Sequence, residues 1–161
     1  MILPPTEKDY ATLFELWELS VRATHDFLPE DYLLEIKQLL PTIFSHVQVY
    51  LWQDHGLIKG FTGVAADKME MLFVHPRSMG QGIGRSLAMY CIHTLAADKV
   101  DVNEQNAQAV SFYKKIGYRQ IGRRELDSMG RPFPLPEMQY FRHHSTITSI
   151  FHFINLAPLV S

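Results

Sequence analysis

Residues 79–84 read Met-Gly-Gln-Gly-Ile-Gly, with a glycine at every second position. The apolar run before them, residues 69–74, predicts a buried strand, which Pro76 closes because proline has no N–H to give to a ladder. The amphipathic run after them, residues 85–97, predicts a helix. A strand, a glycine-rich turn and a helix direct backbone N–H groups and a positive helix end at an anion. We therefore expect a ligand that carries phosphate.

Two common phosphate-binding loops do not fit this segment. A Walker-type loop ends in Gly-Lys-Ser/Thr, whereas Gly84 is followed by Arg85 and Ser86. A Rossmann fingerprint has the spacing G-x-G-x-x-G and an acidic residue about twenty positions further on, and these glycines do not have that spacing. A nucleotide phosphotransferase is therefore a weak hypothesis, because lysine and metal-binding carboxylates are missing around the loop.

The loop resembles the pyrophosphate loop of the GNAT (GCN5-related) N-acetyltransferases, which reads Q/R-x-x-G-x-G/A after a strand ending in V-x-P. The match lies on Val74-His75-Pro76 and on Met79-Gly80-Gln81-Gly82-Ile83-Gly84. Met79 departs from the pattern, since the family usually has Arg or Gln there. We therefore expect one side-chain contact to the pyrophosphate to be missing.

A second match lies on residues 106–118, which resemble the GNAT pattern N-x-x-A-x-x-x-Y-x-x-x-G-F/Y. Its order and its distance behind the glycine loop also fit, and the resemblance extends over residues 7–141. The chain is most similar to a bacterial subgroup with A-T-H-D-F-L, N-E-Q-N and G-x-P-x-P-L segments, here residues 23–28, 103–106 and 130–135. Members of that subgroup are acetyl-CoA-dependent and are linked to protein lysine acetylation.

The resemblance implies that a neutral amine attacks the thioester of acetyl-CoA and that Tyr113 is the general acid. A phenol with a pKa near ~10 can give its proton to the departing thiolate. In the family the pantetheine arm bonds to exposed backbone where two parallel strands splay. The implied cofactor site comprises Leu72, Phe73, Val74, Met79, Gly80, Gln81, Gly82, Ile83, Gly84, Arg85, Asn103, Asn106 and Tyr113.

The general base has three candidates: Glu70, Asp101 and His25. Family members take an acidic group from either central strand, or use a chain of waters, so the alternatives stay open. His25, with Asp26 and Phe27, lies where the acceptor-side helices of the family meet, and we expect these residues to line the acceptor site. Three further histidines near the C-terminus have no usual ligand spacing, so no metal site is expected.

Composition narrows the function classes further. Lys+Arg 15 against Asp+Glu 17 gives a net charge of −2, which offers no electrostatic case for nucleic acid or an anionic membrane. Cys91 is the only cysteine, so no intramolecular disulfide can form, and we expect a buried, inert thiol. The N-terminus lacks a signal-peptide pattern and no apolar run reaches the ~18 residues of a membrane span. A cytoplasmic protein is expected.

The elements that must position these residues follow from periodicity and from Gly and Pro. We expect an α/β (α+β) fold of the GNAT type: a mostly antiparallel sheet with a central parallel strand pair, flanked by helices. Helices are predicted from Thr6 to 23, over 30–40 up to Pro41, over 82–97, and from Asn106 to Gly117. Strands are predicted over 47–53, 57–64, 69–74, 100–103, 118–126 and 135–141, with the strand at 100–103 parallel to that at 69–74.

These elements form one acetyltransferase domain over residues 1–141. Residues 142–161 are an apolar extension that could add a strand, cover an apolar patch or mediate a homodimer. The favoured function is transfer of an acetyl group from acetyl-CoA to a primary amine, either a small molecule or a protein lysine. The alternative is a non-catalytic acyl-CoA-binding or sensor module.

Overall fold

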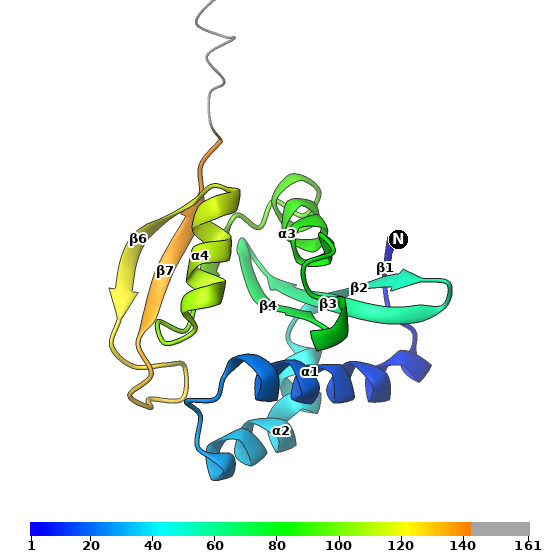
Figure 1. Ribbon diagram of the computed structural model, residues 1–161, viewed down its shortest axis with the longest axis horizontal. Coiled ribbons are helices and arrows are strands. Elements are labelled where there is room, and N and C mark those ends of the chain that lie inside the picture. The colour runs from blue at the N-terminus through cyan, green and yellow to red at the C-terminus, as the bar shows by residue number, and fades with distance from the viewer. Residues whose placement is uncertain (143–161) are drawn as a thin grey trace, which may run out of the picture.

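Seven strands form one sheet in the computed structural model, which describes residues 1–142 (Figure 1). The spatial order is β1-β2-β3-β4-β5-β7-β6, and within it only the β4–β5 pair is parallel. The predicted mostly antiparallel sheet with a central parallel pair is confirmed. The strands are β1 Ile2–Leu3, β2 Gln48–Asp54, β3 Leu57–Ala65, β4 Lys68–Val74, β5 Lys99–Asp101, β6 Tyr118–Arg124 and β7 Leu135–Tyr140.

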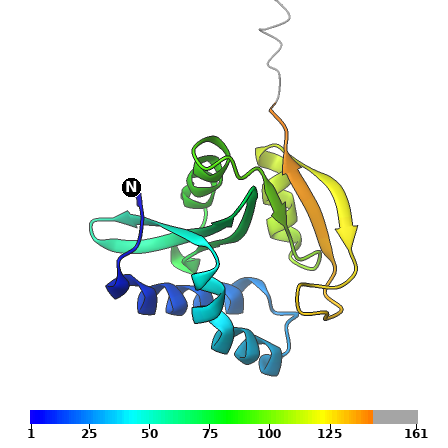
Figure 2. The same ribbon diagram turned by 180° about the vertical axis from the view of Figure 1, so that it is seen from behind.

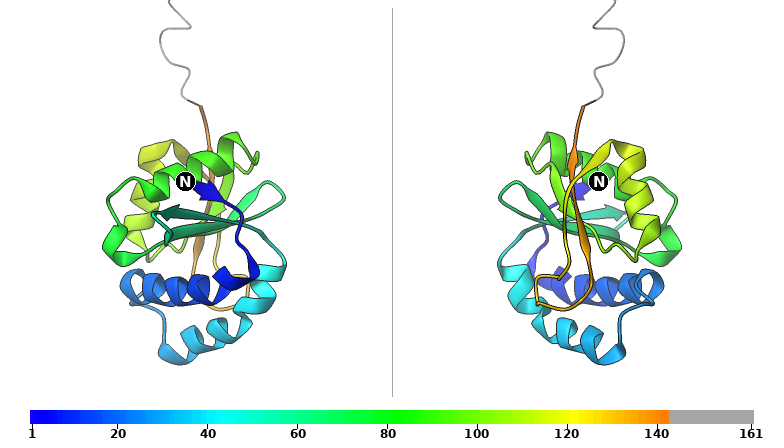
Figure 3. Two further views of the ribbon diagram at one scale, coloured as in Figure 1. Left: turned by 90° about the vertical axis from the view of Figure 1, so that its right-hand side faces the viewer. Right: turned by 90° about the vertical axis from the view of Figure 1, so that its left-hand side faces the viewer.

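Helices cover both faces of the sheet. Figures 1 and 3 show α1 and α2 together on one side, and α3 and α4 on the other. None of the helices within residues 1–142 is long and apolar enough to cross a membrane. The helices are α1 Tyr10–Thr24, α2 Glu30–Ser45, α3 Ile83–His93 and α4 Ala107–Ile116, with short 3-10 turns η1 Glu7–Asp9 and η2 Pro76–Ser78.

Each face of the sheet carries its own hydrophobic core. Leu51, Phe61 and Met71 belong to the core that the sheet forms with α1 and α2. Met69 and Met138 belong to the core under α3 and α4, together with the predicted buried thiol of Cys91, which has no exposed surface. The central strands are thus covered on both sides. Beyond them, β6 and β7 have α4 on one face only, and Figure 2 shows no helix in front of their other face.

The parallel strands β4 and β5 separate after two paired positions. Lys68 lies opposite Lys99, and Met69 lies opposite Val100. Next along β4 comes Glu70, which has no partner on β3 because the pairing register shifts there; such a β-bulge bends its strand.

Past the bulge, the chain that follows β5 pairs with β7 instead of β4. The N–H of Val102 donates to the carbonyl of Pro136 (3.0 Å), and that of Glu104 donates to Pro134 (2.9 Å). One edge of β4, residues 71–74, therefore has no strand of the described chain beside it. The unpaired N–H and C=O groups of this open edge are strong hydrogen-bonding groups.

The second helix continues through Pro41, so the prediction that it ends there is wrong. Proline inside a helix removes a hydrogen bond and costs about 3 kcal/mol. Phe44 lies beyond it, 4% exposed, with its ring centroid 5.0 Å from that of Phe14 and 5.4 Å from that of Phe61. Burial of Phe44 and Leu40 on the two sides of the proline offsets its cost.

Other boundaries differ where tertiary contacts decide them. The third helix ends at His93 rather than at residue 97, and Ala96 has the positive φ of 55°. The fifth strand ends at Asp101 rather than at 103, because the chain turns there toward β7. The sequence analysis missed β1 and did not foresee that β7 would insert between β5 and β6. Apart from Arg142, the predicted extension 142–161 lies outside the described residues.

Gly117 ends α4, as predicted, with a positive φ of 121°, and a Cβ there would meet the Tyr140 ring at 2.8 Å. Gly130 also has a positive φ, 75°, but a Cβ there would meet nothing within 4 Å. We expect Gly117→Ala to lower the free energy of unfolding by about 3 kcal/mol, from backbone strain plus overpacking. Gly130→Ala should lower it by about 1 kcal/mol, from strain alone. Urea denaturation measures both, and equal losses would contradict the role given to Tyr140.

Candidate active site

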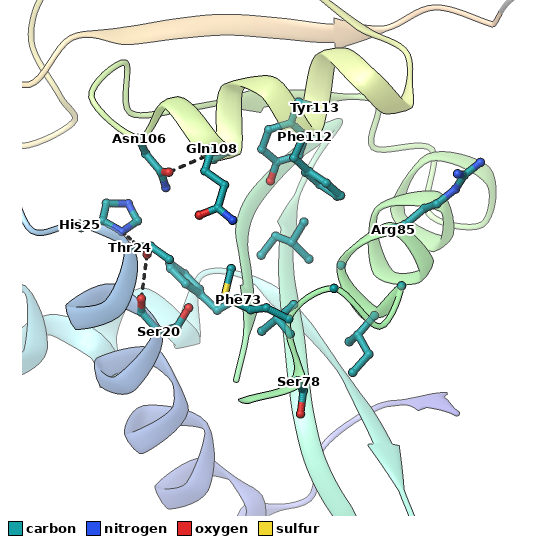
Figure 4. Close-up of a pocket in the computed structure, with 18 residues that line it drawn as sticks. Ser20, Thr24, His25, Phe73, Ser78, Arg85, Asn106, Gln108, Phe112 and Tyr113 are labelled. Carbon is teal, nitrogen blue, oxygen red and sulfur yellow. Dashed lines mark hydrogen bonds between the residues drawn. The ribbon is translucent and has the colours of Figure 1, made fainter. Parts of the chain in front are cut away.

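A cavity of about 350 Å³ opens between the end of α1, the open edge of β4, the glycine loop and α4 (Figure 4). These segments come from distant parts of the chain. The residues that line the cavity are Ser20, Thr24, His25, Leu72, Phe73, Val74, Ser78, Met79, Gly80, Gly82, Ile83, Gly84, Arg85, Asn106, Gln108, Ala109, Phe112 and Tyr113.

The glycine loop forms the cavity wall at the start of α3. Gly80 and Gly82 have left-handed backbone, with φ of 78° and 83°, which glycine adopts without strain. Gly82 is the N-cap of α3, so the N–H groups of the first helical turn have no intrahelical acceptor. These amides and the positive helix end border the cavity and suit a phosphate group. Arg85 also lines this wall, and Met79, 40% exposed, contributes no charge.

Tyr113 lies on the opposite wall, on α4. Asn106 is the N-cap of this helix, and its Oδ1 accepts a hydrogen bond from the N–H of Ala109 (3.2 Å), as the sequence predicts. The Tyr113 ring packs against those of Phe112 (5.1 Å) and Tyr118 (5.2 Å) and is 6% exposed. Its hydroxyl is turned toward the cavity (Figure 4). Burial raises the pKa of Tyr113 well above its usual value, so the phenol keeps its proton at neutral pH.

His25 lies at the end of α1, where its backbone N–H donates to the carbonyl of Val21 (2.7 Å). Its ring Nδ1 lies 2.7 Å from the hydroxyl of Thr24. Burial lowers the pKa of His25 to about 4, and the opposing effect of the Asp26 carboxylate is smaller. The imidazole is therefore neutral at physiological pH.

Some predicted site residues do not line the cavity. Among them, Glu70 occupies the bulge just before the open edge. Burial raises the pKa of its carboxyl, an effect that Lys68 partly opposes and Asp101 adds to. The Asp101 carboxylate itself accepts hydrogen bonds from Lys68 (2.8 Å) and Arg124. The predicted residues away from the cavity are Asp26, Phe27, Glu70, Gln81, Asp101 and Asn103.

The cavity also contains residues that the sequence analysis missed. Gln108 and Phe112 lie one helical turn apart inside the second motif, so helical spacing from Asn106 and Tyr113 was an available signal. The other missed residues are Ser20, Thr24, Ser78 and Ala109. Thr24 stands inside the A-T-H-D-F-L segment next to His25, so that motif was an available signal. No signal marked Ser20, which the packing of α1 against β4 brings to the site.

The β6–β7 loop is attached to the start of α2 beside this site. The Tyr32 hydroxyl donates to Asp127, and the Phe133 ring stacks on the Tyr32 ring at 5.3 Å and 9°. The Arg131 guanidinium lies 4.7 Å from the Tyr32 ring centroid and forms a 2.6 Å ion pair with Glu35. We call these five residues the loop clasp.

Phe27 connects the loop clasp to the cavity. Its ring centroid lies 5.4 Å from that of His25 and 6.1 Å from that of Phe133. Phe27, which was predicted to line the acceptor site, thus adjoins the His25 end of the cavity and joins it to the β6–β7 loop.

Comparison with known proteins identifies the family. Residues 33–133 match the family model described as an acetyltransferase (GNAT) domain. The chain belongs to the GNAT acetyltransferase family. It is therefore an enzyme that transfers an acetyl group to an amine, and the non-catalytic module and the phosphotransferase are not supported.

Relatives of known name cover most of this GNAT acetyltransferase. Peptidyl-lysine N-acetyltransferase YjaB of Salmonella typhimurium is 37% identical over 129 residues, which are 80% of this chain and 89% of the relative. The solution structure of apo-form YjaB from Escherichia coli has a TM-score of 0.80 at 34% identity, covering 87% of this chain and 96% of that one. PaiA N-acetyltransferase from Thermoplasma acidophilum, solved with coenzyme A, shares the fold with a TM-score of 0.65 at 19% identity, covering 88% of this chain and 98% of that one.

Acid should destabilise the protein through His25. Its pKa is about 4 in the folded state against 6.5 ordinarily, so the unfolded state binds the proton more readily. The free energy of unfolding therefore falls as the pH falls from about 6.5 to about 4. Between these pH values, the free energy of unfolding of the His25→Gln variant should fall by roughly 2 kcal/mol less than that of the parent protein. Urea denaturation at both pH values is the measurement.

His55→Gln is the matched control, since it also removes one histidine but the His55 side chain is 87% exposed and does not line the cavity. An identical pH response of the His25→Gln variant and the parent protein would contradict burial of a neutral His25.

Proposed function

We propose that this enzyme transfers the acetyl group of acetyl-CoA to the ε-amine of lysine side chains in proteins. The donor is inferred from the family and from the solved neighbour that holds coenzyme A. The acceptor is inferred from the YjaB relatives, which are named peptidyl-lysine N-acetyltransferases. Residues 23–28 and 103–106 assign the chain to the subgroup with A-T-H-D-F-L and N-E-Q-N segments. A cytoplasmic location and a homodimer stay predictions from the sequence.

One observation carries the proposal: a helix start suited to phosphate, an unpaired strand edge and a protonated phenol border the same cavity. The N–H groups of residues 80–84 and Arg85 would bind the pyrophosphate. The open edge of β4 at Leu72, Phe73 and Val74 would pair with the pantetheine amides, as a strand would. Because Met79 offers no charge, the loop amides and Arg85 supply the phosphate contacts.

Asn106 and Asn103 are assigned to the pantetheine arm. Asn106 lines the cavity and also caps α4. Asn103 does not line it, but its Oδ1 is buried and accepts from no group within residues 1–142. A buried, unpaired acceptor is costly, and an amide N–H of the bound cofactor would satisfy it.

The reaction follows from these positions. The lone pair of a neutral lysine amine attacks the thioester carbonyl carbon, forming the C–N bond, and the C–S bond then breaks. Tyr113 gives its proton to the departing sulfur and regains one from solvent. The attacking nitrogen loses one proton, which goes to the general base.

Glu70 suits the role of base best among the three candidates, acting through a chain of waters because it occupies the bulge just before the open edge and does not line the cavity. Burial raises its pKa, which brings a carboxylate closer to the range useful for accepting a proton near neutral pH. Asp101 is less suitable because Lys68 and Arg124 both donate to its carboxylate. His25, with a pKa of about 4, is a weak base, and we assign it to the acceptor side.

A thiol-release assay with acetyl-CoA tests the acceptor. Lysine-containing peptides should give a kcat/KM at least about tenfold above those of polyamines, aminoglycosides and free amino acids, a difference of about 1.4 kcal/mol in transition-state binding. A small amine that outperforms every peptide would replace the proposed acceptor. Binding of acetyl-CoA without thiol release from any amine would contradict the proposed reaction.

Replacing Tyr113 by Phe removes the proposed acid while keeping the ring that packs between Phe112 and Tyr118. We expect kcat to fall roughly a hundredfold, within the range for general acid–base catalysis, with acetyl-CoA affinity within about twofold. Steady-state kinetics and calorimetry measure the two quantities. Tyr118→Phe is the matched control, since the Tyr118 hydroxyl is buried and unpartnered among residues 1–142. Unchanged turnover in Tyr113→Phe would remove this residue as the acid.

A further inference from the structure

The hydroxyl of Thr24 makes two short contacts at the α1 end of the cavity. Its Oγ1 lies 2.7 Å from the backbone carbonyl oxygen of Ser20 and 2.7 Å from Nδ1 of His25 (Figure 4). All three residues line the cavity. Both distances are those of hydrogen bonds, so each contact must contain one proton.

Counting protons decides which atom donates in each contact. The Ser20 carbonyl can only accept, so the single proton of the Thr24 hydroxyl is used there. The second contact then needs its proton from His25, because a hydroxyl oxygen facing a bare ring nitrogen would leave two lone pairs opposed. Nδ1 of His25 therefore carries a proton.

The other ring nitrogen follows from the charge of the ring. His25 is neutral at physiological pH because it is buried, and Asp26, the charged group that acts on it, does not reverse this. A neutral imidazole has one N–H only, so Nε2 has a free lone pair. No hydrogen-bond partner within residues 1–142 occupies that nitrogen.

We propose that the Ser20 carbonyl and the Thr24 hydroxyl hold His25 in its Nδ1–H tautomer, so that Nε2 is a fixed hydrogen-bond acceptor for the incoming amine. Thr24 is then a positioning residue that acts through His25. The tautomer rests on the two hydrogen bonds of Thr24 and on the burial of the ring, whereas its use toward an amine rests on the proposed function.

An acceptor at this place suits the acetyl transfer. The amine must be neutral, and its lone pair must point at the thioester carbonyl while its N–H groups point elsewhere. His25, the residue that follows α1, lines the same cavity as Tyr113 on α4, and it adjoins Phe27 on the acceptor side. A hydrogen bond from the amine N–H to Nε2 would orient the nitrogen without retaining its proton.

His75 has the opposite tautomer and serves as a reference within the same chain. The backbone N–H of Arg77 donates to Nδ1 of His75 (3.1 Å), so that nitrogen is bare and a neutral His75 carries its proton on Nε2. His25 and His75 should therefore differ in one spectrum of the same sample.

Long-range ¹H–¹⁵N correlation of the imidazole rings of the full chain at neutral pH tests the tautomer. We expect the signal of a protonated Nδ1 for His25 and of a protonated Nε2 for His75, with His25→Gln and His75→Gln variants assigning the two rings. A protonated Nε2 on His25 overturns the proposal. This measurement needs no activity, so it stands even if the proposed acceptor or reaction is wrong.

Kinetics test the positioning role. Thr24→Val keeps the side-chain shape but removes the oxygen that accepts from Nδ1, and the ring should lose its single tautomer. We expect kcat/KM for the amine to fall about tenfold, the effect of one hydrogen bond of about 1.4 kcal/mol, with the Kd for acetyl-CoA within about twofold. Thr24→Ser should restore both the tautomer and the rate.

Thr12→Val, on the exposed face of the same helix, is the control for removing a helical hydroxyl and should behave as the parent protein. Equal losses in acetyl-CoA affinity and amine kcat/KM, or failure of Thr24→Ser to restore the rate, would reduce Thr24 to a packing role and overturn the proposal.

Discussion

The loss of pairing between β4 and β5 is the constraint on which the site depends. A sheet normally satisfies its backbone through neighbouring strands, and leaving N–H and C=O groups unpaired in its middle is costly unless something else bonds to them. Here the Glu70 bulge bends β4, and the chain after β5 follows β7 instead. The result is an open strand edge inside the protein, to which an extended ligand with amide groups is complementary.

The elements around this opening are arranged to border it. The α1 end supplies Ser20, Thr24 and His25, the start of α3 supplies unpaired amides, and α4 supplies Tyr113. The loop clasp then joins α2 to the β6–β7 loop through a stacked ring pair, a hydroxyl–carboxylate bond and an ion pair. It adds a further link between α2 and the β6–β7 loop across the place where β4 and β5 separate.

Burial sets the protonation of Tyr113 and His25, which both line the cavity. It keeps the proton on Tyr113, which suits an acid, and keeps the proton off one nitrogen of His25, which suits a hydrogen-bond acceptor. Burial favours the neutral form of each group. A neutral phenol is protonated and can donate a proton, whereas a neutral imidazole has lost one proton and can accept a hydrogen bond on that nitrogen. The Glu70 carboxyl is shifted in the direction of a better base for the same reason.

The sequence by itself determined the local elements of the site and the fold class. Gly80 and Gly82 predicted a glycine-rich turn before a helix, and Asn106 predicted the cap of α4, because each of these depends on contacts within a few residues. The order of apolar runs predicted the antiparallel sheet with one parallel pair, because strands joined by tight turns pair antiparallel and strands joined through a helix pair parallel. It did not determine that α2 would continue through Pro41, that β7 would insert beside β5, or that Glu70 and Asp101 would lie off the cavity. Nor did it indicate that Ser20 would line the cavity. Those outcomes depend on which distant surfaces pack together: Phe44 against Phe61, α1 against β4, and β7 against the chain after β5. Only the tertiary structure decides such contacts, because their free energy comes from burial shared between segments that no local pattern links.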